Sequence, residues 1–239
     1  MRHGAATDVG LVREVNEDAH LAAPPVFLVA DGMGGHAGGD VASAIVVQEF
    51  AHLAGTSYDA DSALLAVTAA LEASQRRIEE YADGGVGRAA PGTTVAGVLL
   101  VDGDEPAWLV LNLGDSRVYA VRDGELRQVS RDHSLVQELL DAGQITEAEV
   151  ADHPDRHVIT RALGGSGYSE ADVFWLPARD VDRLLVCTDG VNGLIDDATI
   201  AGVLTGEAEP AAAARALVAA ALEAGGEDNA TAVVVDVVG

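Results

Sequence analysis

Four aspartates in this chain stand where apolar runs meet turns. Asp31, Asp115 and Asp189 come at or just after the ends of such runs, and Asp228 comes just before the run 230–235. A strand that is buried on both faces should not end in a carboxylate unless that carboxylate reaches water, a hydrogen-bond donor or a cation. Four like charges that converge on one edge repel one another, and divalent cations are the usual relief. We therefore expect these aspartates to form one metal site.

Glycine directly follows two of these residues, in Asp31-Gly32 and Asp189-Gly190. Glycine lets the backbone turn sharply, which brings its carbonyl close to an ion. Carboxylates together with a carbonyl suit a hard cation such as Mg²⁺ or Mn²⁺. A single Asp-Gly pair is more often only a turn, but its repetition at strand ends favours the metal site. Zinc and cluster sites are disfavoured because Cys187 is the only thiol and the histidines are scattered.

Arg13 opens the segment Arg-Glu-Val-Asn-Glu-Asp, residues 13–18. One interpretation is an ordinary surface ion pair, because arginines beside acids are common and such pairs are weak. The other interpretation is a planar fork that binds two phosphate oxygens at once. In that case Glu17 and Asp18 would orient waters bound to the metals.

The apolar runs also predict the strands that position these residues. Strands are expected at 5–9, 26–30 and 181–188, and hairpins are expected from 93–101 with 107–113 and from 118–122 with 125–129. Asp123-Gly124, between the last two ranges, is a strong signal for a two-residue hairpin turn. The segment from 131 to about 165 is less regular, and we interpret it as a surface flap.

Three helices are expected between these groups of strands. Asp40 can cap the first, and Gly84-Gly85 end the second. The apolar face of the second helix consists of Leu64, Val67, Leu71, Ile78 and Tyr81. The third begins at Pro210 and ends at Gly225-Gly226. Because strands and helices come in groups rather than in strict alternation, the sequence predicts an α+β fold with antiparallel sheets.

The 239 residues carry a formal charge of −25 and no lysine, so every basic side chain other than histidine is an arginine. Such a chain repels nucleic acid and anionic lipid, and we expect neither as a partner. We see no run of about 20 apolar residues that could span a bilayer and no signal-like N-terminus. The single cysteine excludes an internal disulfide. These features favour a cytoplasmic protein.

Seven short motifs occur in order along the chain. They are Arg13–Asp18, Asp31–His36, Gly92–Thr94, Asn112–Arg117, Ile159–Gly164, Thr188–Gly190 and Asp228–Thr231. With this ordered set the chain resembles, over essentially its whole length, the bacterial branch of the metal-dependent serine/threonine protein phosphatases of type 2C. The resemblance implies one catalytic domain over residues 1–239, with the flap at about 131–165. It also implies a four-layer α-β-β-α sandwich, in which two antiparallel sheets lie between layers of helices.

The resemblance also assigns roles to the acidic residues. Asp31 would bridge two Mn²⁺ or Mg²⁺ ions, with the Gly32 carbonyl on one ion and Asp189 and Asp228 on the other. Asp115, together with Asp189, matches a third metal position that is typical of the bacterial branch. In the same comparison, the arginine at position 13 matches the phosphate-binding arginine of the family.

The reaction that this implies is hydrolysis of phosphoserine and phosphothreonine on proteins, by direct attack of a water that bridges the two metals. The expected partners are phosphorylated proteins, above all serine/threonine kinases and their substrates, and the expected state is a monomer. Some relatives have a histidine directly after Asp-Gly as a proposed general acid, whereas Met33 stands there in this chain. His36 is near in sequence, and a metal-bound water held by Asp18 is the donor that we favour.

Two other functions remain open. The same scaffold could hydrolyse small phosphate esters, or it could bind phosphoproteins without catalysis, although a binding-only relative is expected to lose metal aspartates that are present here. A cysteine-phosphatase mechanism fails, because Gly193 stands where that chemistry needs an arginine six residues after Cys187. We expect Cys187 to be a buried apolar residue. We expect His133 and His157, both in the flap, to be solvated or turn-forming.

Overall fold

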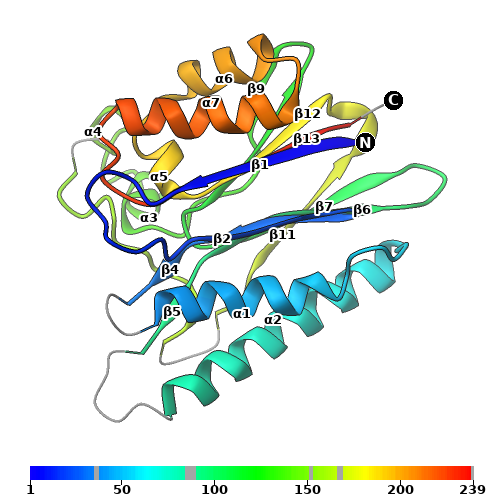
Figure 1. Cartoon of the computed structure of the whole chain (residues 1–239), viewed down its shortest axis with the longest axis horizontal. Coiled ribbons are helices and arrows are strands. Elements are labelled where there is room, and N and C mark those ends of the chain that lie inside the picture. The colour runs from blue at the N-terminus through cyan, green and yellow to red at the C-terminus, as the bar shows by residue number, and fades with distance from the viewer. Residues whose placement is uncertain (35–37, 84–89, 151–152, 166–168, 238–239) are drawn as a thin grey trace.

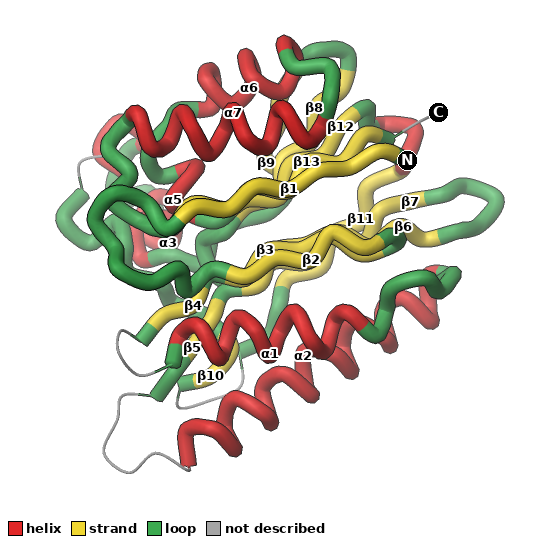
Figure 2. Tube along the Cα trace, viewed as in Figure 1, coloured by secondary structure: helices red, strands yellow, loops and turns green. Residues whose placement is uncertain are grey.

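The computed structural model describes residues 1–34, 38–83, 90–150, 153–165 and 169–237. Two five-stranded antiparallel sheets pack face to face, and helices cover the outer face of each sheet (Figures 1 and 2). The expected α+β sandwich with four layers is therefore confirmed. None of the helices in the described part of the chain is long and apolar enough to cross a bilayer.

The first sheet has the strand order β1-β13-β12-β8-β9. Its strands are β1 (Arg2–Asp8), β8 (Arg117–Arg122), β9 (Glu125–Gln128), β12 (Arg183–Cys187) and β13 (Ala230–Asp236). The second sheet has the order β11-β7-β6-β3-β2. Its strands are β2 (Ala19–Ala23), β3 (Val26–Ala30), β6 (Val95–Val101), β7 (Ala107–Leu113) and β11 (Asp172–Pro177). A small third sheet joins β4 (Gly32–Met33), β5 (Gly92–Thr93) and β10 (Leu163–Gly164) in the order β10-β5-β4.

The helices lie in two outer layers and in the flap. The second sheet is covered by α1 (Gly39–Ala51) and α2 (Ala60–Asp83), and the first by α6 (Asp197–Gly206) and α7 (Pro210–Glu223) (Figure 1). The short helix α5 (Asp189–Asn192) follows β12, and η1 (Ala178–Asp180) follows β11. The flap contains α3 (Leu135–Asp141) and α4 (Glu147–Val150).

Alternating side chains of the strands fill three separate cores, because successive residues of a strand point to opposite faces of the sheet. In β3, Phe27 and Val29 belong to the core between the two sheets, together with Trp108. Leu28 belongs to the core between the second sheet and the helices α1 and α2. Leu185 of β12 belongs to the third core, between the first sheet and α7. Strands that are buried on both faces explain the unbroken apolar runs in the sequence.

Most of the expected strands are present close to their expected positions. The predicted strand 26–30 is β3, and both predicted hairpins form, as β6 with β7 and β8 with β9. Asp123 and Gly124 have φ angles of 51° and 82°, as a two-residue turn of this type requires. Pro210 is the first residue of α7, as expected.

Some expectations about the helices are wrong. Asp40 does not cap α1, because Gly38 is the N-cap residue and Asp40 lies in the first turn. Leu64 and Tyr81 of α2 are 42% and 41% exposed. Val67, Leu71 and Ile78 of the expected face are buried, and smaller residues, which include Ala63, Ala70 and Ser74, complete it. The expected stop at Gly84-Gly85 lies outside the described residues. The strands β2 and β11 and the helix α6 were not expected from the sequence.

Candidate functional site

A cavity of about 440 Å³ lies where the ends of several strands meet. Its wall brings together residues from distant parts of the sequence. They include Arg13, Glu17, Asp31, Gly32, Asp189 and Asp228. Six of the eight predicted site residues thus gather at this cavity, whereas Asp18 and Asp115 do not line it.

Two glycines allow the backbone segments of this site to approach one another closely. A Cβ atom on Gly190 would lie 1.9 Å from the carbonyl oxygen of Asn229. A Cβ atom on Gly32 would lie 2.3 Å from the carbonyl oxygen of Gly39. Real Cβ atoms do not make such contacts, so only glycine fits at either position. The close approach of Gly190 to Asn229 brings Asp189, which precedes Gly190, next to Asp228, which precedes Asn229.

Asn229 holds the segment that carries Arg13 and Glu17. Its side-chain nitrogen donates to the carbonyl oxygens of Val9 and Val15, at 2.9 and 3.0 Å. Its side-chain oxygen accepts from the backbone N–H of Glu17 at 2.8 Å. Asn229 is 6% exposed, so these bonds are shielded from water. The buried amide of Asn229 thus holds the chain on both sides of Arg13 against the start of β13.

The aspartates of the site are held in an environment that disfavours their negative charge. Burial, followed by the charge of Asp189, raises the pKa of Asp31 well above its usual value. Burial also raises the pKa values of Asp115 and Asp189. Buried side-chain oxygens of Asp18, Asp115 and Asp189 have no hydrogen-bond partner among the described residues. A buried oxygen without a partner costs free energy, which a cation could recover.

Asp18 lies behind this wall and contacts two threonines. Its Oδ2 accepts from the hydroxyl of Thr188 at 2.8 Å and from the hydroxyl of Thr231 at 2.7 Å. Burial, together with the charges of Asp189 and Asp228, raises the pKa of Asp18 to about 7 despite these bonds. Asp18 therefore belongs to the same electrostatic cluster, although it does not line the cavity.

The carboxylates fit a divalent cation. Among the described residues, no three His, Cys, Asp or Glu side chains are already arranged as the ligands of a metal ion. Mutual repulsion explains a looser arrangement, because burial and the charge of Asp189 raise the pKa values of Asp31 and Asp115 and, of the four aspartates, only Asp228 is paired with an arginine among the described residues. The buried oxygens without partners and the raised pKa values instead favour a metal site, because a positive ion would bind these oxygens and stabilise the negative charge of the carboxylates. Ligands can close around an ion only once its charge is present, so a looser arrangement of the carboxylates is compatible with a metal site.

Arg13 lies at the cavity and is joined to one of its aspartates. Its Nη2 donates to Oδ2 of Asp228 at 2.8 Å, and the two side chains are 52% and 36% exposed. Arg13 is thus paired with a residue 215 positions away rather than with the acids beside it in sequence. This placement favours the phosphate-binding interpretation over the ordinary surface pair.

A second cavity of about 220 Å³ lies beside the first, and Asp189 lines both. Asp115 lines this second cavity and not the first. Arg156 and His157, which come from the flap, line both cavities. No local signal in the sequence indicates the placement of Arg156, because the flap contacts the site through tertiary structure alone.

The other residues considered from the sequence have mixed outcomes. Met33 lines the first cavity, whereas His36 lies outside the described residues. Cys187 is fully buried, as expected, and burial raises its pKa to about 12. Of the two roles expected for His133, solvation is wrong, because this residue is only 4% exposed. Its Nδ1 accepts from the backbone N–H of Gly114 at 3.2 Å.

The chain is similar to a family of known proteins and to several of their structures. The sequence model described as "Protein phosphatase 2C" matches residues 12–224. The serine/threonine protein phosphatase PstP of Mycobacterium tuberculosis (strain H37Rv) is 40% identical over 238 residues, which cover 100% of this chain and 45% of that protein. The serine/threonine phosphatase stp of Listeria monocytogenes (strain EGD-e) is 33% identical over 242 residues, which cover 96% of this chain and 93% of that protein. The chain thus spans about half the length of PstP, but nearly all of the length of stp.

Solved structures agree with this relationship. The crystal structure of the M. tuberculosis phosphatase PstP/Ppp superposes with a TM-score of 0.90 at 38% identity, and the match covers 98% of this chain and 97% of that one. The catalytic domain of PstP in complex with two manganese ions superposes with a TM-score of 0.88 at 38% identity, with coverage of 98% and 97%.

Proposed function

Because the chain belongs to the protein phosphatase 2C family, we propose that it hydrolyses phosphoserine and phosphothreonine in proteins with the help of divalent metal ions. One observation carries the proposal: Asp31, Asp189 and Asp228 line a single cavity together with Arg13. Acidic residues alone would repel a phosphoryl group, and an arginine alone could bind it without reaction. The combination suits metal-assisted hydrolysis of a phosphate ester.

The residues that would hold Mn²⁺ or Mg²⁺ are the aspartates 31, 189 and 228 and the carbonyl of Gly32. Asp115 would hold a third ion together with Asp189, because the two line the second cavity. The manganese-bound structure of the PstP catalytic domain supports two core ions at a site of this family. When bound, such ions make a nearby water more acidic and neutralise charge on the phosphoryl group.

Arg13 would bind the phosphoryl group of the substrate. Among the described residues, only Asp228 engages its guanidinium, through Nη2. The remaining N–H groups can therefore donate to phosphoryl oxygens as that group enters the cavity. This contact orients the ester and stabilises the charge that develops on its oxygens.

Glu17 and Asp18 would hold water at the base of the site. Thr188 and Thr231 both donate to Oδ2 of Asp18, which leaves its buried Oδ1 to accept a hydrogen bond from water. The departing serine or threonine oxygen needs a proton, and we assign the delivery to water held by Asp18. Met33 cannot deliver that proton, because a thioether carries none.

The substrate proteins are proposed to be those phosphorylated by serine/threonine kinases, together with the kinases themselves. The names of the relatives PstP and stp support a protein substrate rather than a small ester. We also propose that the protein works as a monomer in the cytoplasm. A single buried cysteine is compatible with a reducing compartment.

The test is hydrolysis of a phosphothreonine peptide by the purified chain, with Mn²⁺ or with a chelator. We expect turnover only with Mn²⁺. Asp189→Asn should lower it by more than about 100-fold, a loss larger than that for residues outside the ligand shell. Asp104→Asn, in an exposed loop, serves as the matched control and should change nothing. Efficient hydrolysis of small phosphate esters but not of phosphopeptides would favour the small-ester alternative.

A further inference from the structure

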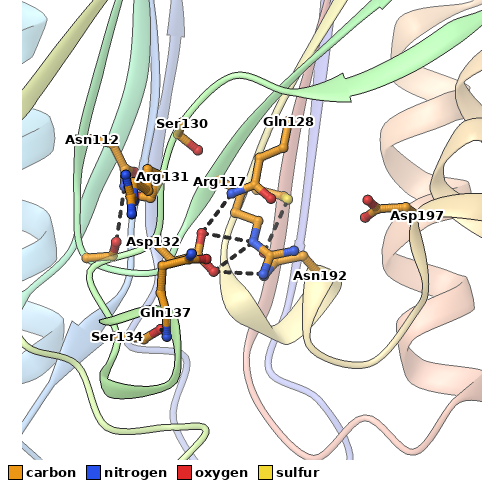
Figure 3. Close-up of polar contacts among 12 residues, drawn as sticks. Asn112, Arg117, Gln128, Ser130, Arg131, Asp132, Ser134, Gln137, Asn192 and Asp197 are labelled. Atoms are coloured by element: carbon orange, nitrogen blue, oxygen red, sulfur yellow. Dashed lines mark hydrogen bonds and ion pairs between the residues drawn. The ribbon is translucent and has the colours of Figure 1, made fainter. Parts of the chain in front are cut away.

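An ion pair in the wall of the second cavity joins β8 to the beginning of the flap (Figure 3). Arg117 donates from Nε to both carboxylate oxygens of Asp132, at 3.0 and 2.9 Å, and from Nη2 to Oδ2 at 2.7 Å. Gln128 donates to the same carboxylate at 2.9 Å. The Asp132 side chain is only 8% exposed. A planar guanidinium that meets a desolvated carboxylate at two points fixes the geometry of both groups.

The other side of the Arg117 guanidinium is also held. Its Nη1 donates to the hydroxyl oxygen of Tyr119 at 2.9 Å. That hydroxyl donates to Oδ1 of Asp197, in the first turn of α6, at 3.1 Å. Burial raises the pKa of Tyr119, so its hydroxyl keeps the proton that it donates. Arg117 is thus fixed between the flap and the outer helical layer.

Asp132 starts a short stretch that is bonded to the loop carrying Asp115. The backbone N–H of His133 donates to the carbonyl oxygen of Gly114 at 2.9 Å. In return, the N–H of Gly114 donates to Nδ1 of His133 at 3.2 Å. Arg117 and Gly114, which take part in these contacts, lie within two residues of Asp115 in the sequence. They bind the beginning of the flap firmly to one wall of the second cavity.

The same stretch is bonded to the end of the flap. The N–H of Thr160 donates to the carbonyl oxygen of His133, and the N–H of Leu135 donates to that of Val158, both at 2.8 Å. Val158 directly follows Arg156 and His157, which line both cavities. A continuous set of bonds therefore leads from Arg117 to the two flap residues at the catalytic cavity.

Arg156 is the residue that this arrangement places for a ligand. Among the described residues, none forms a hydrogen bond or an ion pair with its guanidinium. Arg127 and Arg215 also form no ion pair among the described residues, but of these three arginines only Arg156 lines the two cavities. A peptide is longer than the cavity, so residues beside the phosphorylated one extend beyond its wall, where the exposed Arg156 and His157 can contact them.

We propose that the Arg117–Asp132 pair positions Arg156 and His157 for the binding of protein substrates, which makes Arg117 and Asp132 positioning residues. This inference rests on the proposed phosphatase function. A small aryl phosphate enters the cavity without crossing the flap, so its binding depends much less on this pair. The pair therefore contributes to the preference for protein substrates over small esters.

The test compares Arg117→Lys with Arg183→Lys. Lysine keeps the charge at 117 but cannot bind Asp132 at two points while also holding Tyr119. Arg183 forms an equally buried pair with Asp236 far from both cavities, so its variant is the matched control. We expect Arg117→Lys to raise KM for a phosphothreonine peptide about tenfold, which corresponds to the loss of one charge-assisted contact. KM for p-nitrophenyl phosphate and kcat for both substrates should change less than about twofold on the same scale.

A double substitution shows whether Arg117 acts through the flap. In an Arg156→Ala background, Arg117→Lys should cause no further rise in peptide KM, because the contact that it positions is already absent. Amide hydrogen exchange gives a readout that does not need activity. Exchange should increase in peptides covering 132–136 and 156–161 in Arg117→Lys, and it should stay as in the unmodified protein in Arg183→Lys. If Arg117→Lys does not fold, Gln128→Ala removes one bond to Asp132 and should show a smaller change of the same pattern.

Three results would overturn the inference. One is an equal effect of Arg117→Lys on peptide and aryl phosphate, and another is the same pattern in Arg183→Lys. The third is full additivity of Arg117→Lys with Arg156→Ala. In each of these cases the unmodified protein still hydrolyses the peptide with Mn²⁺, so the proposed function stands. An unmodified protein that is inactive on both substrates would overturn the proposed function and this inference together.

Discussion

The strand β13 has an aspartate near each end, and the two carboxylates are satisfied in different ways. At the far end, Asp236 accepts from Nε of Arg183 at 2.7 Å and from Nη2 of Arg2 at 2.8 Å. Arg183 in turn donates to three backbone carbonyls at the end of α6 and just beyond, those of Leu204, Glu207 and Ala208. Nearly every charged group at this end has a partner.

At the near end, two residues before β13, Asp228 accepts from the half-exposed Arg13 and from the backbone N–H of Asn229, both at 2.8 Å. Its neighbours at the cavity are the acids Asp31 and Asp189, whose pKa values are raised by burial. The same two residue types therefore build a closed structural pair at one end and an incomplete site at the other. What separates the two is the number of donors and acceptors left for a ligand.

The largest expected effect comes from substituting one aspartate at each end. Asp236→Asn leaves the buried charge of Arg183 without its counter-ion and should lower the free energy of unfolding by about 3 kcal/mol or more. Asp189→Asn removes a carboxylate from a repelling cluster, so the metal-free protein should keep its stability or gain some. Chemical denaturation of the metal-free proteins measures both.

Mn²⁺ sharpens this contrast. A ligand that binds only the folded state raises the unfolding temperature. Asp236→Asn should keep the rise that Mn²⁺ causes in the unmodified protein, and Asp189→Asn should lose it. If both variants lose the stability of the metal-free protein, or both lose the rise in unfolding temperature with Mn²⁺, the two ends of β13 do not differ in the way proposed.

A smaller effect is expected from Arg13→Ala. The loss of a charge-assisted contact to the phosphoryl group costs about 1.5–3 kcal/mol, which is roughly a 10- to 150-fold change. We expect it mainly as a raised KM in steady-state kinetics. Stability should change little, because the pair with Asp228 is half exposed. An unchanged KM would contradict the phosphate-binding role and would make this pair as structural as the one at the far end.

The smallest expected effect is the pH dependence of the metal-free protein. Asp18 has a pKa of about 7 in the folded state, and those of Asp31, Asp115 and Asp189 are also raised. The folded state therefore binds more protons than the unfolded state between roughly pH 4 and pH 7, so the free energy of unfolding falls as pH rises through this range. With a chelator present, the unfolding temperature should drop by a few degrees from pH 5 to pH 8. Asp18→Asn should reduce this drop, and an unchanged profile would show that Asp18 is not part of the cluster.

The parts of the fold that the sequence predicted are those with strong local signals. The buried run 26–30, the Asp123-Gly124 turn and Pro210 at the start of α7 each carry such a signal. The strand β2 was missed because Ala19–Ala23 contains no β-branched or aromatic residue. In α2 the predicted residues Val67, Leu71 and Ile78 are buried, whereas Leu64 and Tyr81 remain exposed.

The candidate site likewise contains residues that the sequence indicated and residues that it did not. The aspartates at 31, 189 and 228 could be found because a carboxylate next to a buried strand needs an explanation that local structure does not offer. Arg156 and the buried His133 could not be found, because their surroundings depend on how the flap folds back onto the Gly114 loop. No periodicity in residues 131–165 encodes that contact. The metal roles of the individual ligands remain predictions.

The most direct test of the central claim is a crystal structure of the protein soaked in Mn²⁺, with anomalous scattering collected at the manganese edge. We expect two adjacent manganese peaks bridged by Asp31, with Asp189 and Asp228 as further ligands. No peak should appear at Asp236, where the carboxylate is already satisfied. The absence of paired peaks at the cavity, with these carboxylates turned away from one another, would contradict the proposed metal site.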